Sequence, residues 1–220
     1  MNYPDDFIDQ IICGDCLEVM KEIPDKSINL VLTDPPYGIK ESNEKNRTRA
    51  RLAKTTDFGH YDWDKQKVKK EYFEEIRRVS KNQVIFGGNY YASILGDSSC
   101  WLVWDKDNGK NDFADCELAW TSFKTAVRKF KWRWKGMLQE DMKNKEKRVH
   151  PTQKPLPLFK WILEKYSQPN DVILDPFLGS GTTAVACLEL NRHFIGIELS
   201  SEYCEIAKKR IREIQPQLVF

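Results

Sequence analysis

The tetrapeptide Asp34-Pro35-Pro36-Tyr37 places hydrogen-bond acceptors directly after the apolar run Ile28–Leu32. Its two prolines fix the backbone and remove two N–H donors, so the Asp34 carboxylate and rigidly held carbonyls remain as acceptors. Such a set suits an amino group on a flat ring, which offers two N–H donors and a face on which Tyr37 can stack. An ordinary loop that follows a strand is the alternative interpretation of the tetrapeptide taken alone.

A second motif, Asp175-Pro-Phe-Leu-Gly179-Ser-Gly181-Thr-Thr183, lies between a predicted strand and a predicted helix. Glycines let the backbone approach a ligand closely, and the helix N-terminus offers free amides. Glu198 follows 23 residues after Asp175, where an acidic side chain can accept from ribose hydroxyls. Neither the P-loop lysine nor GxGxxG spacing is present, so a small adenosine-containing cofactor is favoured over nucleotide hydrolysis or dinucleotide binding. A turn that only closes a βαβ unit is the alternative.

Short β-rich runs alternate with helical patterns, which predicts an α/β fold with a mostly parallel sheet. Predicted strands are Asp9–Cys13, Ile28–Thr33, Val84–Phe86, Trp101–Trp104, Glu117–Thr121, Val172–Leu174 and Phe194–Ile197. Predicted helices are Leu17–Ile23, Val68–Val79, Pro157–Tyr166, Thr182–Leu190 and Glu202–Ile214. Strict alternation in Lys129–Lys135 predicts another strand, with aromatic rings on one face and basic side chains on the other. Both motifs follow strands, so we expect them at the edge of the sheet where ligands of open α/β sheets bind.

Together, DPPY at 34–37 and DPFLGSGTT at 175–183 resemble the amino-methyltransferases that act on DNA and use S-adenosylmethionine. The agreement extends to Gly14-Asp15, His150-Pro-Thr-Gln-Lys-Pro155 and Glu198, and so covers essentially the whole chain. The order, with DPPY first and the glycine turn last, is similar to the permuted β group of that family. The resemblance implies a single Rossmann-like methyltransferase domain over residues 1–220, circularly permuted, with a mostly parallel sheet flanked by helices.

The resemblance also implies how S-adenosylmethionine is bound. The segment from Phe177 to Thr183 would hold its methionine end, Glu198 its ribose, and Asp15 would lie near its adenine. Thr152 and Lys154 are expected as polar contacts, although a solvated lysine at a helix start is an equal alternative for Lys154. The expected cofactor-binding residues are Asp15, Asp34, Thr152, Lys154, Asp175, Phe177, Gly179, Ser180, Gly181, Thr182, Thr183 and Glu198, and no metal is expected.

The implied reaction is methylation of N6 of an adenine that has been flipped out of double-stranded DNA. Expected catalytic residues are Asp34, Pro35, Pro36 and Tyr37. Tyr37 would stack on the base, while the Asp34 carboxylate and the Pro35 carbonyl would accept both amino hydrogens and expose the nitrogen lone pair. Positioning and electrostatics would supply most of the rate enhancement. Cytosine N4 fits the same geometry, but within the family an aspartate before Pro-Pro-Tyr favours adenine and a serine favours cytosine.

Charge is distributed unevenly along the chain. The net charge is +2, yet Lys124–Arg148 holds ten basic residues against three acidic ones, and Lys40–Lys54 holds six against two. We expect insertions at about 38–64 and 122–150 to contact DNA phosphates; two solvated loops are the alternative. The expected DNA-binding residues are Arg47, Arg49, Arg51, Arg128, Lys131, Arg133 and Lys135, whereas Phe130, Trp132 and Trp134 are expected to pack in the core.

Composition excludes several classes of protein. A hydrophobic content of 40% excludes wholesale disorder. Without an apolar run of about 18 residues or a signal-peptide core, the chain is expected to be cytoplasmic and free of membrane. Six dispersed cysteines indicate reduced thiols, and the CxxC at Cys13–Cys16 lacks the second pair of a zinc site.

The length of 220 residues leaves room only for insertions, not for a separate target-recognition domain. We therefore expect a short recognition sequence and a homodimer. Methylation of RNA or of a protein amide is disfavoured, because enzymes of those kinds usually carry the cofactor loop before the tetrapeptide. A catalytically silent DNA-binding module of the same fold is disfavoured too, since every residue that the chemistry needs is present.

Overall fold

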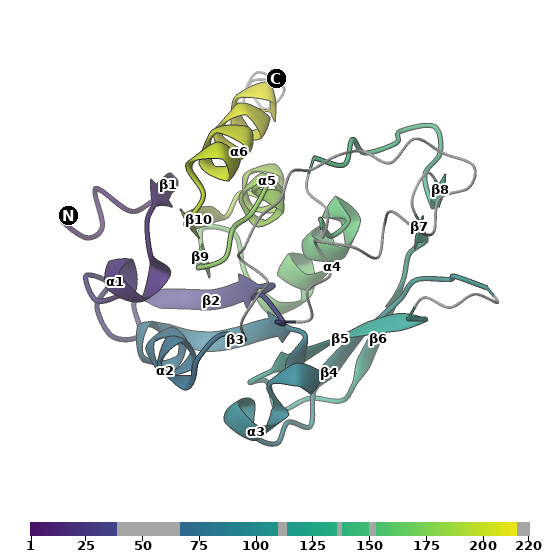
Figure 1. The fold of residues 1–220 in the computed structure, drawn as a ribbon, viewed down its shortest axis with the longest axis horizontal. Coiled ribbons are helices and arrows are strands. Elements are labelled where there is room, and N and C mark those ends of the chain that lie inside the picture. Colours follow the sequence, from purple (N-terminus) through teal and green to yellow (C-terminus); the bar gives the residue numbers. More distant parts are fainter. Residues whose placement is uncertain (39–66, 110–113, 136–137, 150–152, 215–220) are drawn as a thin grey trace.

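The computed structural model describes residues 1–38, 67–109, 114–135, 138–149 and 153–214, and a twisted eight-stranded sheet runs through its centre (Figure 1). The strand order is β1-β10-β9-β2-β3-β5-β4-β6. Neighbours from β1 to β3 are parallel, β5 is antiparallel to both β3 and β4, and β6 is parallel to β4. The strands are β1 Gln10–Cys13, β2 Ile28–Thr33, β3 Ser80–Phe86, β4 Trp101–Asp105, β5 Cys116–Thr121, β6 Arg128–Lys131, β9 Val172–Asp175 and β10 His193–Glu198.

Helices cover both faces of the sheet. Helices α1 (Cys16–Met20), α2 (Lys70–Val79) and α3 (Ala92–Leu95), with the short 3-10 helix η1 (Gly88–Tyr90), pack on one face. Helices α4 (Leu156–Tyr166), α5 (Thr182–Glu189) and α6 (Ser201–Ile214) pack on the other face. The mostly parallel α/β architecture is therefore confirmed. None of the helices in the described part of the chain is long and apolar enough to cross a membrane.

Strand β2 lies in the middle of this sandwich because its sequence, INLVLT, is apolar on both faces. Leu30 and Leu32 point into the core beneath α4 and α5, while Val31 points into the core beneath α2. Successive side chains of a strand alternate between faces, so this run needs apolar cover on both sides. The predicted bounds of this strand are confirmed.

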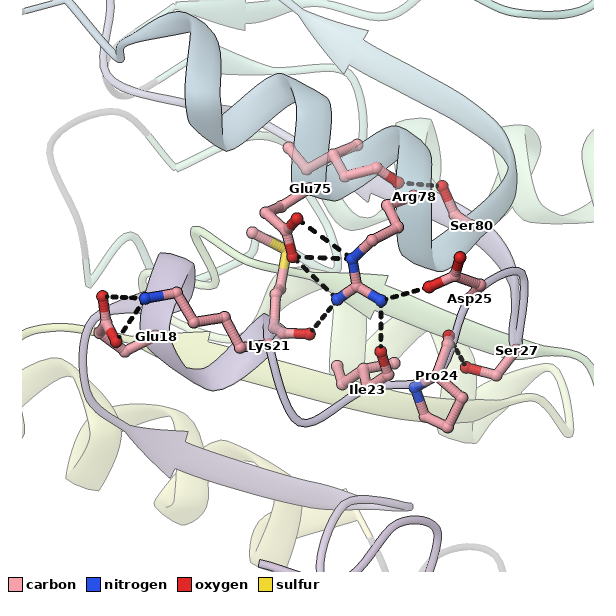
Figure 2. Close-up of polar contacts among 11 residues, drawn as sticks. Glu18, Lys21, Ile23, Pro24, Asp25, Ser27, Glu75, Arg78 and Ser80 are labelled. Carbon is pink, nitrogen blue, oxygen red and sulfur yellow. Dashed lines mark hydrogen bonds and ion pairs between the residues drawn. The ribbon is translucent and has the colours of Figure 1, made fainter.

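Arg78 on α2 ties that helix to the loop between α1 and β2, as Figure 2 shows. Its guanidinium donates to the Met20 carbonyl at 2.7 Å, to the Ile23 carbonyl at 2.9 Å and to an Asp25 carboxylate oxygen at 2.6 Å. Its Nε donates to the carboxylate of Glu75 at 3.0 Å, one turn earlier on α2. The planar fork of arginine satisfies the last carbonyl of α1 and a loop carbonyl at once, and fixes the path of the chain into β2.

The predicted single strand over Lys129–Lys135 is wrong. Strand β6 ends at Lys131, and β7 (Trp134–Lys135) pairs with β8 (Leu138–Gln139) in a separate two-stranded sheet. The ladder stops because its partner β4 ends at Asp105, whose carbonyl accepts from the Trp132 amide at 2.9 Å. Core packing of Phe130, Trp132 and Trp134 is confirmed, since all three rings lie in or against the hydrophobic core.

Strand β3 begins at Ser80, four residues before the predicted start at Val84. Its first residues are polar, yet Ser80 and Gln83 are buried and bonded to each other, with Gln83 Nε2 donating to Ser80 Oγ at 2.9 Å. Polar side chains that satisfy each other in this way can enter a buried strand, and hydrophobic periodicity does not detect them.

Strands β2 and β9 lie side by side at the centre of the sheet, and the chain leaves them in opposite directions. From β2 it crosses by α2 to β3, and from β9 it crosses by α5 to β10 on the other side (Figure 1). Such a reversal leaves a crevice at the carboxyl ends of the two strands, which is where open α/β sheets bind ligands.

Candidate active site

A cavity of about 670 Å³ lies at the carboxyl ends of β2 and β9, and most of the predicted cofactor-binding residues line it. Aromatic rings form part of its wall, namely those of Tyr72, Phe159, Phe177 and Tyr203. The predicted residues that line it are Asp15, Asp34, Lys154, Asp175, Phe177, Gly179, Ser180, Thr182, Thr183 and Glu198. Gly181 is not among the lining residues, and Thr152 lies outside the described residues. One wall comes from β2 and a second from β9, so residues far apart in the sequence share one site.

The glycine turn after β9 is held by the carboxylate of Glu198. Glu198, the last residue of β10, accepts from the Gly179 amide at 2.8 Å through Oε2 and from the Ser200 amide at 2.8 Å through Oε1. Burial raises the pKa of Glu198, while these backbone donors favour its ionised form. The carboxylate expected to bind ribose therefore also shapes the turn.

Gly181 precedes α5 in a conformation that only glycine adopts easily, with φ of +85°. A Cβ at this position would lie 2.8 Å from the Cβ and 3.2 Å from the Cα of Ala207 on α6. Arg210, also on α6, donates to the Ser180 carbonyl at 2.8 Å and to Thr182 Oγ1 at 3.2 Å. Helix α6 thus supports the turn from behind, and the sequence carried no signal for Arg210.

Asp175 connects the two motifs. Its Oδ1 accepts from Thr33 Oγ1 at 2.7 Å and from the Phe177 amide at 3.1 Å, and its Oδ2 accepts from Thr183 Oγ1. Burial raises the pKa of Asp175 to about 6 against these hydrogen bonds, which lower it. Thr33 immediately precedes Asp34, so this contact fixes the DPPY motif against the glycine turn.

Asp34 lies at the edge of the cavity with both carboxylate oxygens engaged. The Tyr37 hydroxyl donates to Oδ1, and the Lys154 ammonium donates to Oδ2. Burial raises the pKa of Asp34, and Lys154 opposes this effect. Because burial and the adjacent Asp34 carboxylate raise the pKa of Tyr37, its hydroxyl keeps the proton that it donates.

The aromatic end of DPPY is fixed by its neighbours. The Tyr37 ring stacks on Tyr90 with centroids 4.9 Å apart and planes 19° apart, and the Tyr91 hydroxyl donates to the Pro36 carbonyl. Gly87, with φ of +66°, passes so close to the Tyr37 ring that a Cβ there would overlap it. The ring expected to stack on a base thus has one face on Tyr90. Sequence reasoning missed Tyr90 and Tyr91, because only the fold brings them to DPPY.

Lys154 is buried, with 6% of its side chain exposed, so the alternative of a solvated lysine is wrong. Besides Asp34, its Nζ lies 3.1 Å from Oε2 of Glu117 on β5, and Glu117 also pairs with Lys106. Burial lowers the pKa of Lys154, but the two carboxylates outweigh burial and raise it. Burial likewise raises the pKa of Glu117, but Lys154 and Lys106 outweigh it and lower that pKa to about 2. Sequence reasoning missed Lys106 and Glu117; a charged residue in the apolar strand ELAWT was the available signal.

Asp15 follows β1 by two residues and lies on the cavity wall, and its place near adenine stays a prediction. Its Oδ1 accepts from the Leu17 amide at 2.8 Å and caps α1, and its Oδ2 accepts from the Tyr72 hydroxyl at 3.3 Å. The Tyr72 ring in turn lies 6.1 Å from that of Phe177. The rings of Tyr72 and Phe177 and the carboxylate of Asp15 therefore close this side of the cavity. Sequence reasoning did not predict Tyr72.

The predicted DNA-binding residues are only partly described. Arg47, Arg49 and Arg51 lie outside the described residues, and Lys135 falls in β7. Arg128 and Lys131 lie on the edge strand β6, and Arg133 follows it, all three exposed. Both Lys131 and Arg133 form ion pairs with Asp107, the former at 3.1 Å, so part of the positive charge of this segment is compensated locally.

The donor and acceptor groups around the cavity fit a nucleoside that carries an amino-acid tail. Glu198 and Asp15 supply carboxylate acceptors suited to hydroxyl and amino groups, and the aromatic walls suit a flat ring. Gly179, in the turn after β9, lines the cavity, and the absence of a Cβ there permits close approach to its backbone. Asp34 also lines this space and carries acceptor oxygens.

Comparisons with known proteins agree with this chemistry. Residues 104–209 match the family described as DNA methylase. The Type II methyltransferase M.HinfI of Haemophilus influenzae is 32% identical, over an alignment that covers 96% of this chain and 70% of the relative. The Type II methyltransferase M.HpaI of Haemophilus parainfluenzae is 28% identical, with 92% of this chain and 74% of the relative covered.

Solved structures share the fold over nearly the whole chain. The M1.HpyAVI-SAM complex superposes with a TM-score of 0.60 at 29% identity, covering 92% of this chain and 98% of that one. The PvuII DNA methyltransferase, named as cytosine-N4-specific, superposes with a TM-score of 0.61 at 16% identity, covering 95% and 92%. At 16% identity, the similarity to the PvuII enzyme shows only a shared fold.

Proposed function

The chain belongs to the family of DNA amino-methyltransferases, and from that premise we propose that it methylates N6 of adenine in double-stranded DNA, with S-adenosylmethionine as methyl donor. One observation carries the proposal. The Thr33–Asp175 hydrogen bond of 2.7 Å joins the acceptor Asp34 to the turn that borders the cavity, so a bound amine and a bound cofactor would meet there.

The proposed cofactor site uses residues from three strand ends. Backbone of the turn after β9 would bind the methionine end, Glu198 the ribose hydroxyls, and Asp15 with Tyr72 and Phe177 the adenine region. When bound, S-adenosylmethionine supplies a methyl group that its sulfonium makes electrophilic. The buried carboxylate of Asp175 and the partly exposed carboxylates of Asp34 and Glu198 favour a cation in this space, because opposite charge stabilises their ionised forms.

Asp34 would prepare the target nitrogen. The lone pair of an exocyclic amine is delocalised into the ring, so the amine is a poor nucleophile until its hydrogens are held. The Asp34 carboxylate and the Pro35 carbonyl would each accept one N–H and direct the lone pair towards the cavity. Each oxygen of an ionised carboxylate accepts two hydrogen bonds, so Oδ1 of Asp34 can accept from the amine while the Tyr37 hydroxyl remains bonded to it. Positioning and electrostatics then supply the rate enhancement.

Adenine is preferred over cytosine because an aspartate, Asp34, stands before Pro-Pro-Tyr, as in the adenine-directed pattern of the family. The base must leave the duplex stack to reach Asp34. We propose that Tyr37 stacks on the flipped base through the ring face opposite Tyr90 and that the Tyr90 contact holds the ring in position.

DNA binding is assigned to the basic segments at about 38–64 and 122–150, within one catalytic domain that spans residues 1–220. Phosphate contacts position a protein on the duplex without specifying sequence. Exposed Arg128, Lys131 and Arg133 are proposed to make such contacts together with Lys135, Arg47, Arg49 and Arg51. A homodimer remains a prediction, for which light scattering in solution is the direct measurement.

The test of the reaction is incubation of the purified protein with unmethylated genomic DNA and isotopically labelled S-adenosylmethionine, followed by mass spectrometry of the digested nucleosides. Label in N6-methyldeoxyadenosine is expected. Label in N4-methyldeoxycytidine would retain the mechanism and contradict the assigned base. No label in DNA would contradict the proposed substrate.

The role of Asp34 is tested with Asp34→Asn and Asp34→Ala. Both variants are expected to lose methyl transfer by at least about a hundredfold, the effect of one well-placed electrostatic group. Both should still bind S-adenosylmethionine, measured by calorimetry, since the turn and Glu198 are unchanged. Retained turnover in Asp34→Ala would refute this mechanism.

A further inference from the structure

Lys154 lies between two carboxylates that come from different strands. Its Nζ donates to Oδ2 of Asp34, which follows β2, and lies 3.1 Å from Oε2 of Glu117 on β5. Glu117 in turn pairs with Lys106, the first residue after β4. The result is a chain of alternating charge, Lys106, Glu117, Lys154 and Asp34, that leads from the end of β4 to Asp34 at the cavity wall.

Glu117 belongs to this chain and not to the cofactor cavity. Among the described residues that line the cavity, Lys154 and Asp34 are present and Glu117 is absent. About a quarter of the Glu117 side chain is exposed, and Lys154 is buried, so the charges act on each other with limited screening by water. A carboxylate here cannot be explained by contact with the cofactor.

The chemistry proposed for Asp34 makes two opposing demands on its surroundings. Asp34 must be ionised to accept an amino N–H strongly, and burial disfavours the ionised form. A single lysine would restore ionisation, yet an ammonium held by Asp34 alone would compete with the incoming amine for the same carboxylate. A second carboxylate on that lysine shares its N–H donors and relieves the competition.

We propose that Glu117 is a positioning residue for methyl transfer, which shares the Lys154 ammonium with Asp34 and so leaves the Asp34 carboxylate free to accept the amino group of the target base. This inference rests on the proposed role of Asp34. When the base arrives, the Lys154 ammonium can move away from Asp34, because Glu117 remains as its carboxylate partner. Lys106 keeps Glu117 itself ionised, consistent with its pKa of about 2.

The groups that set the charge of Asp34 come from every neighbouring element. Lys154 and Tyr37 contact it directly. Glu117 and Lys106 lie beyond Lys154, and Asp175 on β9 acts from the side of the glycine turn. Tyr91 lies beyond Tyr37, at the Pro36 carbonyl. Of these, Glu117 and Lys106 are the two whose charge can be removed without touching Asp34 or the cavity wall.

The experiment measures single-turnover methylation of a DNA substrate from pH 5 to 9, with saturating cofactor, in Glu117→Gln and Lys106→Gln. Removal of the Glu117 charge lowers the pKa of Asp34, so the acidic limb of the rate profile moves to lower pH by about one unit. The plateau rate falls about tenfold, because Lys154 then binds Asp34 alone, the effect of losing roughly one hydrogen bond to a charged group. Removal of the Lys106 charge moves the acidic limb the opposite way, to higher pH.

Controls separate this role from simple support of the fold. Glu189→Gln removes the carboxylate that pairs with Lys160 at 2.8 Å, a similar contact outside the site, and is expected to leave the profile unchanged. Glu117→Asp is expected to recover part of the plateau rate. Cofactor affinity, measured by calorimetry, is expected to stay within twofold of the unmodified protein in Glu117→Gln. A purely structural role would lower thermal stability and rate without moving the acidic limb.

Two results would overturn the inference. One is an acidic limb that stays in place in both Glu117→Gln and Lys106→Gln, and the other is a shift in the same direction in both. If Glu117→Gln does not fold, the shift in Lys106→Gln decides alone. Asp34→Asn is assayed in parallel: turnover retained there refutes the proposed role of Asp34, whereas an inactive Asp34→Asn with unshifted Glu117 and Lys106 profiles refutes only the role of Glu117.

Discussion

Substitution of Gly181 by alanine should destabilise the protein and weaken cofactor binding through a single added methyl group. Gly181 has φ of +85° and precedes α5 in the turn that borders the cavity. The methyl carbon would meet Ala207 on α6, with 2.8 Å to its Cβ and 3.2 Å to its Cα. Backbone of a packed helix cannot move aside as the end of a flexible side chain can.

The expected cost has two parts. Left-handed backbone costs a non-glycine residue about 1 kcal/mol, and overpacking of a filled core costs about 1–3 kcal/mol. The free energy of unfolding should therefore fall by about 2–4 kcal/mol, a sizeable share of the total for a domain of this size. Displacement of the turn should also weaken S-adenosylmethionine binding by about tenfold or more, which is 1.4 kcal/mol.

Urea unfolding followed by tryptophan fluorescence measures the first effect, and calorimetric titration measures the second. Gly109→Ala is the matched control, because Gly109 has φ of +65° with nothing within 4 Å of its added Cβ. It should cost only the backbone strain, about 1 kcal/mol. In a double-mutant cycle, Ala207→Gly should relieve part of the clash and give a favourable coupling energy of about 1 kcal/mol with Gly181→Ala.

Two results would refute this reasoning. Equal destabilisation of Gly181→Ala and Gly109→Ala would show that contact with α6 contributes nothing. Absence of coupling to Ala207→Gly would show that the destabilisation arises elsewhere than at the close contact between the turn and the helix.

Three further predictions follow from charges and hydrogen bonds. Burial raises the pKa of Asp175 to about 6, above its value in the unfolded chain, so the native state binds this proton more tightly and the free energy of unfolding falls as the pH rises from about 4 to 6. In Asp175→Asn the urea midpoint should therefore change less with pH over that range. The same pH dependence of the midpoint in both proteins would contradict the assignment. Arg78→Ala should lower the free energy of unfolding by about 2 kcal/mol, because the carbonyls of Met20 and Ile23 lose their charged donor. An unchanged urea midpoint would exclude that role. Asp107→Asn removes the carboxylate that pairs with Lys131 and Arg133, and asparagine tolerates the φ of +48° at this position. The variant should bind DNA several-fold more tightly at low salt, and its affinity should fall more steeply as salt is added. An unaltered salt dependence would show that these two side chains do not contact phosphate.

Local chemistry made much of the fold predictable. The apolar run of β2, the βαβ unit from β9 to β10 and the amphipathic α2 and α6 each depend on residues close in sequence, and all were predicted within a few residues of their bounds. The strand predicted over Lys129–Lys135 failed because its length depends on where β4 ends, which periodicity in the segment itself does not record. The polar start of β3 was missed for a related reason, since its buried serine and glutamine satisfy each other only once folded.

The candidate site likewise has a part that depends on residues close in sequence and a part that depends on the folded structure. Prolines at 35 and 36 and glycines at 179 and 181 restrict or free the backbone by covalent structure alone, so the sequence by itself determined both motifs and the type of ligand they suit. Which charges act on Asp34 was decided only by the tertiary structure. Lys154 is 120 residues away along the chain, and Glu117 reaches it because β5 pairs beside β3. Interaction between charges depends on distance and burial, and neither exists until the sheet has assembled.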